Sequence, residues 1–375
     1  MALPESFGFA GLLDIAVGQE QLLGGVSMQV DNATVYSNVA ELQPAFGRHL
    51  YADIYTRRAC SVDPIHLVRL DPDTTLHGGG EFLVTSRGRM PREQLAPYLA
   101  DKPDQIRDIR SQWRPVVRVS AECLLIARFG IYTWGHWLAE ILPKLVLVEA
   151  RYPGRFRFAL PHHVLTDGNP HNAWSRIRES LSAYGIADHQ ILGLQPEMDY
   201  RFDSLFAVTD VWSDYVMHPG ATLAMRARLV MDRPPSLAAT APRLSVERIS
   251  GGRMLANGPD IRARLEARGF VSKPIGTMSF LQQVTAFQSA SVVFGVLGSD
   301  LTGLLYAREG IKVISVAPAI FGDRFFYALI LDRKGFYADL RGEVTAWDET
   351  ADHRSTFHIQ PEELNVAMLA LGEKD

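Results

Sequence analysis

Short apolar runs and longer amphipathic stretches alternate along the chain between residues 122 and 210. The runs that predict buried strands are Cys123–Ala127, Arg157–Leu160, Ile191–Leu194 and Leu205–Thr209. Between them, Trp134–Ala150 and Asn172–Tyr184 carry apolar residues at helical spacing, and Gly185 suits the residue that follows a helix. Strands that alternate with helices in this way predict a parallel sheet covered by helices.

The same alternation returns after residue 243. Strands are predicted at Leu244–Glu247, Phe270–Ser272, Ser291–Val296 and Lys312–Val316. Helices are predicted at Pro259–Arg268, at Ser279–Ser289 and at Asp300–Ala307, with Ser279 and Ser299 in N-cap positions. The Pro- and Ala-rich stretch Asp232–Pro242 predicts a linker. We therefore expect two α/β lobes joined by a linker, with a cleft between them.

The first third of the chain lacks this regular alternation of strands and helices. Short β-leaning runs such as Gly25–Val30 are interrupted by Gly, Asp and Pro, and the charged stretch Arg87–Arg118 resembles a connecting arm. The predicted organisation is an N-terminal β-leaning extension (1–118), an N-terminal lobe (119–232), a C-terminal lobe (243–345) and a tail with a helix (346–375).

Composition narrows the class of protein. Of the 375 residues, 47% are hydrophobic and 21% are charged, which is typical of a soluble globular protein, and the net charge of −4 gives no general attraction to nucleic acid. The two cysteines, Cys60 and Cys123, argue against a disulfide framework or a structural zinc site. The N-terminus lacks the basic region of a signal peptide, and no stretch is apolar enough to span a membrane. We expect a cytoplasmic protein, with peripheral association with the inner membrane left open.

One candidate for chemistry lies on the first predicted helix. His136 and Glu140 are four residues apart and so share a helix face, and the neighbouring positions are largely apolar. A carboxylate in such a place can serve as a general base. The alternatives are a surface His136–Glu140 pair or an ion pair of Glu140 with Lys144. A metal site is disfavoured because the motif supplies only two ligands.

Two further candidates lie in the C-terminal lobe. The glycine-rich turn at Gly298 and Ser299 joins a buried strand to a helix, so its backbone N–H groups suit a diphosphate, although the charge of Asp300 counts against this. Arg248 and Arg253 follow the first strand of this lobe, where ligands bind in α/β sheets, and paired arginines can hold phosphates. An ordinary turn and solvated loop arginines are the alternatives.

Together these segments resemble glycosyltransferase family 61, which includes capsular polysaccharide biosynthesis proteins of bacteria. The resemblance covers roughly residues 120–340 and rests on four motifs in the same order. The matching residues are Trp134, His136, Trp137, Glu140, Pro143 and Lys144; Arg248, Arg253, Asn257, Gly269 and Phe270; Ser279, Phe280 and Gln283; and Gly295, Gly298, Ser299, Leu301, Thr302 and Tyr306. The sequence departs from the family pattern at Gly258, Leu297, Gly303 and Ser315.

The resemblance implies a GT-B fold, in which two Rossmann-like lobes face each other across a cleft, and an inverting, metal-independent transfer without a cofactor. The C-terminal lobe would bind a nucleoside-diphosphate sugar, and the N-terminal lobe would bind a glycan or lipid-linked glycan acceptor. Glu140 would be the catalytic base, with His136 as the second choice. The donor-binding residues would be Arg248, Arg253, Asn257, Gly298, Ser299 and Thr302.

The expected role is the synthesis of a surface polysaccharide. A non-catalytic subunit that binds a nucleotide sugar or a glycan is the main alternative, because the departures at Leu297 and Ser315 lie near the expected donor. A dinucleotide-dependent oxidoreductase ranks lower, since no Gly-x-Gly-x-x-Gly motif follows a predicted strand.

Overall fold

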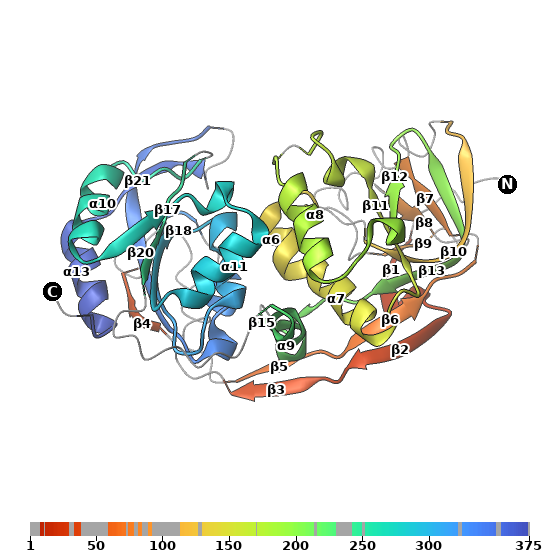
Figure 1. Ribbon diagram of the computed structural model, residues 1–375, viewed down its shortest axis with the longest axis horizontal. Coiled ribbons are helices and arrows are strands. Elements are labelled where there is room, and N and C mark those ends of the chain that lie inside the picture. The colour runs from red at the N-terminus through yellow and green to blue at the C-terminus, as the bar shows by residue number, and fades with distance from the viewer. Residues whose placement is uncertain are drawn as a thin grey trace. The chain divides into compact units, whose positions relative to one another are not determined.

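The computed structural model describes residues 8–10, 12–29, 34–38, 59–72, 74–78, 82–84, 89–91, 113–126, 130–169, 171–213, 216–229, 242–249, 252–321, 325–349 and 354–373. The chain divides into two compact units. The first comprises Met1–Val26, Asp63–Ser213 and Gly220–Met225, and the second comprises Ser27–Val62, Asp214–Pro219 and Arg226–Asp375. Each unit has its own mixed sheet with helices beside it (Figure 1), which confirms the predicted α/β class. The GT-B arrangement stays a prediction.

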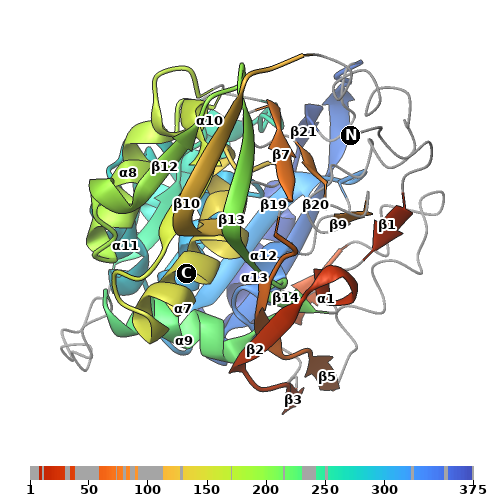
Figure 2. The ribbon, with the colours of Figure 1, turned by 90° about the vertical axis from the view of Figure 1, so that its right-hand side faces the viewer.

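The sheet of the first unit has the strand order β12–β11–β10–β13–β6–β2, and β7 and β8 continue it from β13. Figure 2 shows β10, β13 and β7 next to one another. Its parallel part consists of β10 (Val116–Leu125), β11 (Arg157–Pro161), β12 (Ile191–Leu194) and β13 (Asp199–Val208). These strands confirm the four predicted from apolar runs. Its antiparallel part consists of β2 (Gly18–Leu23), β6 (Ile65–Arg69), β7 (Thr75–His77) and β8 (Phe82–Val84).

Helices follow the parallel strands of the first unit as the sequence predicts. A helical segment runs from Trp134 to Arg151, and α8 (Trp174–Ala183) lies between β11 and β12 in the chain. The smaller elements are β1 (Gly8–Ala10), α1 (Leu12–Ile15), β9 (Arg89–Pro91), η4 (His162–Leu165), η5 (Asp188–Gln190) and β14 (Trp212–Ser213). After β12 the chain returns to the other side of β10. The carboxyl ends of β10 and β13 therefore form a topological switch point, where open α/β sheets bind ligands.

The sheet of the second unit has the order β17–β16–β18–β19–β20–β21, with β4 on β20. Its parallel strands are β16 (Arg243–Val246), β17 (Phe270–Lys273), β18 (Val292–Val296), β19 (Lys312–Pro318), β20 (Phe336–Ala346) and β4 (Thr34–Ser37), whereas β21 (Thr356–His358) is antiparallel. From β16 the chain passes to β17 on one side and then to β18 on the other. The switch point of this unit therefore lies between β16 and β18.

Helices cover both faces of the second sheet. Figure 1 shows α10 (Gly258–Ala267) and α13 (Pro361–Ala370) on one side and α11 (Phe280–Ser289) on the other. Ile261 of α10 and Leu364 of α13 share a buried cluster with Phe294 of β18. Ser279 caps α11 in a capping box with Gln282, as predicted. The remaining elements of the second unit are β3 (Val26–Gln29), β5 (Ala59–Val62), β15 (Val216–Met217), η6 (Ile275–Thr277), η7 (Ser299–Tyr306), α12 (Phe325–Ala328) and η8 (Leu331–Arg333), whereas most of α9 (Pro219–Ala227) belongs to the first unit.

Strands from the first 118 residues join the sheets of both units. β2 and β6 extend the first sheet, whereas β4 pairs with β20 in the second. The proposed division into four segments stays a prediction, and the predicted linker lies outside the described residues apart from Pro242.

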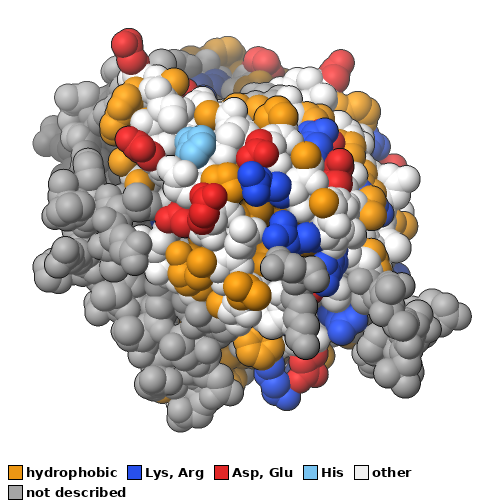
Figure 3. Space-filling model, turned by 90° about the vertical axis from the view of Figure 1, so that its left-hand side faces the viewer, with side chains coloured by type: hydrophobic (Ala, Val, Ile, Leu, Met, Phe, Trp, Pro, Cys, Tyr) orange, Lys and Arg blue, Asp and Glu red, His pale blue; other side chains and the backbone are white. Residues whose placement is uncertain are grey.

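Charges of both signs share the surface of the second unit. Figure 3 shows an oblique band of Lys and Arg side chains on one face, with Asp and Glu on both sides of it. Among the described residues, no helix is long and apolar enough to cross a membrane.

Candidate active site

The helix that carries His136 and Glu140 contains an irregular turn. α6 (Trp134–His136) continues directly into a π-helical turn, η3 (Trp137–Ile141), and then into α7 (Leu142–Arg151). Pro143 explains the irregularity, because its ring would collide with the carbonyl of Ala139 in a regular helix and it has no N–H to donate to that oxygen. The indole Nε1 of Trp212 donates to the Ala139 carbonyl instead, at 2.7 Å. The predicted helix is confirmed, but the π-helical turn was not predicted.

The hydrogen bond from Trp212 to the Ala139 carbonyl should contribute to the stability of the fold. In Trp212→Phe the Ala139 carbonyl loses its indole donor, and an acceptor left unsatisfied away from water costs about 1–3 kcal/mol. We expect the free energy of unfolding, measured by urea denaturation, to fall by about this amount. Trp113→Phe is the matched control, because Trp113 is 87% exposed. An equal loss in both variants would show that the contact with Ala139 does not stabilise the helix.

His136 and Glu140 form a direct pair. The Nδ1 atom of His136 lies 2.8 Å from Oε1 of Glu140, and the His136 side chain is 45% exposed whereas that of Glu140 is 14% exposed. Lys144 forms an ion pair with Asp210, at 2.8 Å. Of the two pairings that the sequence left open for Glu140, the structure shows the one with His136.

The turn before the helix fits closely around the His136 ring. Gly130 has a φ of +78°, which favours glycine, and a Cβ atom there would lie 2.9 Å from Cδ2 and 3.4 Å from Nε2 of His136. The amide of Thr133 closes this turn by donating to the carbonyl of Gly130, at 2.8 Å. A larger residue than glycine at position 130 would therefore displace the imidazole.

The His136–Glu140 pair lies at the switch point of the first unit. The helix follows β10, and Asp210 and Trp212, which contact it, follow β13. Because β10 and β13 are parallel neighbours, their carboxyl ends lie at the same edge of the sheet. The pair is thus placed where α/β sheets bind ligands.

Arg248 and Gly298 meet at the switch point of the second unit. Arg248 follows β16 and Gly298 follows β18, and Nη1 of Arg248 occupies the place that a Cβ atom on Gly298 would need. Nε of Arg248 donates to the carbonyl of Gly252, at 2.8 Å. Burial lowers the pKa of the Arg248 guanidinium from its ordinary value, and the carboxylate of Asp300 opposes this shift. The guanidinium remains a cation at neutral pH.

The turn after Gly298 differs from the prediction. It leads into a 3₁₀-helix, η7 (Ser299–Tyr306), rather than an α-helix, and its N-cap is Gly298 rather than Ser299. The expected capping role of Ser299 is therefore wrong, because the helix begins one residue earlier than predicted and Ser299 is its first residue. Ser299 is half-buried and Thr302 is fully buried.

Arg253 and Asn257 are held by other parts of the second unit. The Arg253 guanidinium lies 4.2 Å from the ring centroid of Phe321, and the residue has a φ of 64°. The Asn257 amide donates to the carbonyl of Ile359 at 2.8 Å, and its Oδ1 accepts from the Ile359 amide at 3.4 Å. The structure thus joins Arg248 to the glycine turn, whereas Asn257 ties the start of α10 to the segment after β21.

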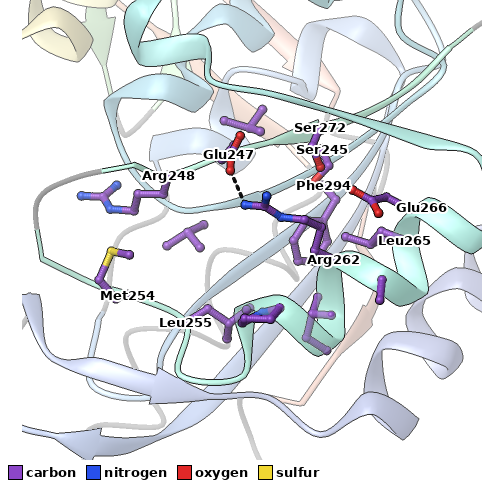
Figure 4. Close-up of a pocket in the computed structure, with 16 residues that line it drawn as sticks. Ser245, Glu247, Arg248, Met254, Leu255, Arg262, Leu265, Glu266, Ser272 and Phe294 are labelled. Carbon is purple, nitrogen blue, oxygen red and sulfur yellow. Dashed lines mark hydrogen bonds and ion pairs between the residues drawn. The ribbon is translucent and has the colours of Figure 1, made fainter.

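A cavity of about 420 Å³ lies between α10 and the sheet, and Arg248 is at its rim (Figure 4). Arg262 projects into it from α10 and forms an ion pair with Glu247. The sheet contributes Ser245, Ser272 and Phe294, which are in register on neighbouring strands. This cavity was not predicted from the sequence. The one feature of the sequence that could have indicated it is the polar residue Ser245 in the short buried strand β16.

Comparison with known proteins supplies the family. The model of the glycosyltransferase 61 family matches residues 134–314, from the start of α6 to the middle of β19. This match supports assignment of the chain to glycosyltransferase family 61. The match to family 61 indicates glycosyltransferase activity, and the matched segment contains the His136–Glu140 pair and the Arg248–Gly298 contact. No curated protein matches the chain.

Three of the four departures from the family 61 pattern, Leu297, Gly303 and Ser315, have local structural reasons. Leu297 is fully buried, so an apolar side chain suits its position. Gly303 packs directly against the Phe287 ring, which occupies the place of a Cβ atom, so a larger residue would require that ring to move. Both residues shape the interior beside the glycine turn.

A further departure, Ser315, belongs to a buried polar network. Its hydroxyl lies 3.0 Å from Oδ1 of Asp339, directly opposite on β20. Arg341 pairs with Oδ2 of the same carboxylate at 2.9 Å, and both charged side chains are almost fully buried. A buried pair of this kind is stable only when its remaining hydrogen-bonding groups are satisfied, which the Ser315 hydroxyl helps to achieve.

Within the described part of the chain, no three or more His, Cys, Asp and Glu side chains gather in a way that could hold a metal ion.

Proposed function

We propose that this chain is an inverting glycosyltransferase that moves a sugar from a nucleoside diphosphate to a glycan or lipid-linked glycan acceptor, without a metal ion or cofactor, in the synthesis of a surface polysaccharide. The observation that carries the proposal is the contact of the Arg248 guanidinium with Gly298, at the carboxyl ends of β16 and β18 and at the rim of a cavity. The protein would act in the cytoplasm, in solution or at the inner membrane.

The arrangement around Arg248 suits a leaving diphosphate. Negative charge grows on the diphosphate as its bond to the sugar breaks, and without a metal ion this charge needs cationic side chains and backbone N–H groups. Arg248 supplies a cation that is screened from water, which strengthens its interaction with an anion. The glycine turn brings backbone close to the same place, and the neighbouring cavity is large enough for a nucleoside.

The first unit supplies the groups that an acceptor needs. In a single displacement with inversion, the acceptor oxygen attacks the anomeric carbon while a base removes its proton. The His136–Glu140 pair can supply that base, because it is partly exposed and lies where α/β sheets bind ligands.

A donor screen tests the proposal. A ligand at 100 times its dissociation constant stabilises the folded protein by about 2.7 kcal/mol, so a thermal-shift panel of UDP-, GDP- and CMP-sugars should identify a donor. Transfer or slow hydrolysis of the stabilising donor is then expected. Binding without turnover on any acceptor would instead support a non-catalytic subunit, which the departures at Leu297 and Ser315 would explain.

We expect the activity to survive removal of divalent cations. Arg248 and the backbone of the glycine turn would stabilise the leaving group without a metal ion. The initial rate in excess EDTA should therefore stay within about twofold of the untreated rate, which is a change in the activation barrier of less than about 0.5 kcal/mol. A rate lost in EDTA and restored by Mn²⁺ or Mg²⁺ would contradict the metal-independent mechanism.

A further inference from the structure

We propose that the proton acceptor in this reaction is Nε2 of His136, and that Glu140 is a positioning residue that holds the imidazole in the required tautomer and orientation. This inference rests on the proposed function. It reverses the order of preference from the sequence, which placed Glu140 first because a carboxylate on an apolar helix suits a base.

The contact between the two side chains fixes the tautomer. When the Glu140 carboxylate is ionised it only accepts hydrogen bonds, and we then assign the hydrogen to Nδ1 of His136, which lies 2.8 Å from Oε1 of Glu140. In the neutral ring the other nitrogen, Nε2, is then the one with a free lone pair. The pair therefore presents a basic nitrogen on the side away from Glu140.

Exposure separates the roles of the two side chains. A base must reach the acceptor hydroxyl within hydrogen-bond distance, and His136 is 45% exposed whereas Glu140 is 14% exposed. The bare Cα of Gly130 lets the preceding turn pack closely against the Cδ2 side of the ring, which holds the imidazole in place. The Glu140 carboxylate contacts Nδ1, so the ring nitrogen that the pair leaves for a proton from the acceptor is Nε2.

The helix holds this arrangement rigidly. Trp137, next to His136, is fully buried, and its indole nitrogen donates to the hydroxyl of Ser180 at 2.9 Å. The π-helical turn contains Glu140 and is braced by the contact between Trp212 and Ala139. π-Helical turns occur often at functional sites, and here the turn places Glu140 against the His136 ring.

In the proposed step, proton transfer to His136 accompanies the displacement of the diphosphate by the acceptor oxygen. The acceptor O–H gives its proton to Nε2 of His136, and its oxygen forms a bond to the anomeric carbon of the donor sugar. The bond from that carbon to the diphosphate oxygen breaks, and the nucleoside diphosphate leaves with the electron pair. The resulting imidazolium is stabilised by the carboxylate of Glu140, and it then returns the proton to water.

The tautomer can be measured without substrate. We expect ¹⁵N-histidine NMR of the wild-type protein at neutral pH to show His136 with Nδ1 protonated and Nε2 bare, its signals being those that disappear in His136→Gln. In Glu140→Gln the same ring should shift towards the other tautomer. A wild-type His136 protonated at Nε2 and bare at Nδ1 would overturn the proposal, whether or not a donor has been found.

A double-mutant cycle tests the roles in turnover. We expect His136→Gln to lower kcat by about 10²–10⁴-fold with donor affinity unchanged, and Glu140→Gln to have little further effect in that background, since residues that act as a unit are not additive. A His136→Gln enzyme within threefold of wild-type kcat, or a full Glu140→Gln loss in the His136→Gln background, would overturn the proposal. Absence of turnover with every donor would instead contradict the proposed function.

Discussion

Glu140→Gln is expected to lower kcat by about 10²–10⁴-fold, the usual contribution of general-base catalysis. The substitution keeps the shape of the side chain but removes the carboxylate that contacts Nδ1 of His136 at 2.8 Å. The loss follows whether Glu140 accepts the proton itself or fixes the imidazole that does. Donor affinity should barely change, because the groups proposed to bind the donor belong to the second unit. Steady-state kinetics and calorimetric donor binding check both parts.

Glu197→Gln is the matched control for this prediction. Glu197 is an exposed carboxylate between β12 and β13, outside the helix that carries His136 and Glu140, so its loss should leave kcat unchanged. A purely structural role for Glu140 predicts a lower melting temperature with nearly normal turnover. A Glu140→Gln enzyme that keeps kcat within threefold of wild type would therefore remove Glu140 from the mechanism.

Arg248→Gln should weaken donor binding by about 10- to 150-fold. A hydrogen bond to a charged group contributes about 1.5–3 kcal/mol, which corresponds to this range in a dissociation constant. The guanidinium is largely buried and packs against Gly298. Because ions from solution screen buried charges weakly, they would not replace its interaction with the diphosphate after the substitution. Isothermal titration with the donor found in the thermal-shift panel measures the change.

Arg264→Gln controls for the loss of a positive charge from the same unit. Arg264 lies on α10 and pairs with Asp260 on the helix surface, at 3.1 Å, so donor affinity should be unaffected by its replacement. If Arg248→Gln and Arg264→Gln bind the donor equally well, the switch point between β16 and β18 does not hold the diphosphate. Melting temperatures for both variants distinguish a local loss of affinity from unfolding.

The elements with strong periodicity could be predicted from sequence. At least one face is buried in the parallel strands β10–β13 and β16–β19 and in the helices between them. The spacing of apolar residues in the sequence therefore predicts these elements. The pairing of β4 with β20 could not be predicted, because strand order depends on contacts between residues far apart in the chain. The 3₁₀ form of η7 was missed for another reason: in a segment of eight residues, apolar side chains three residues apart fit both α- and 3₁₀-helices.

The candidate site was only partly accessible to sequence reasoning. Spacing on a helix placed His136 beside Glu140, because that contact is local. The approach of Arg248 to Gly298 follows from the order of β16 and β18, which a single sequence does not reveal. The actual partners of Asn257 and Lys144 were not foreseen, since Ile359 and Asp210 lie far away in the chain.

The strand β4 cannot take its place in the sheet until the chain is almost completely synthesised. The amide of Asn38, next to β4, donates to the carbonyl of Arg341, which lies 303 residues later in the chain. At about 5–20 residues per second, a ribosome needs about 15–60 s to travel that distance. During this time β4 has no β20 to pair with, so it leaves the ribosome as an open edge that can pair with other nascent chains. Chaperone binding to the first 40 residues should therefore affect the yield of folded protein more than its final stability.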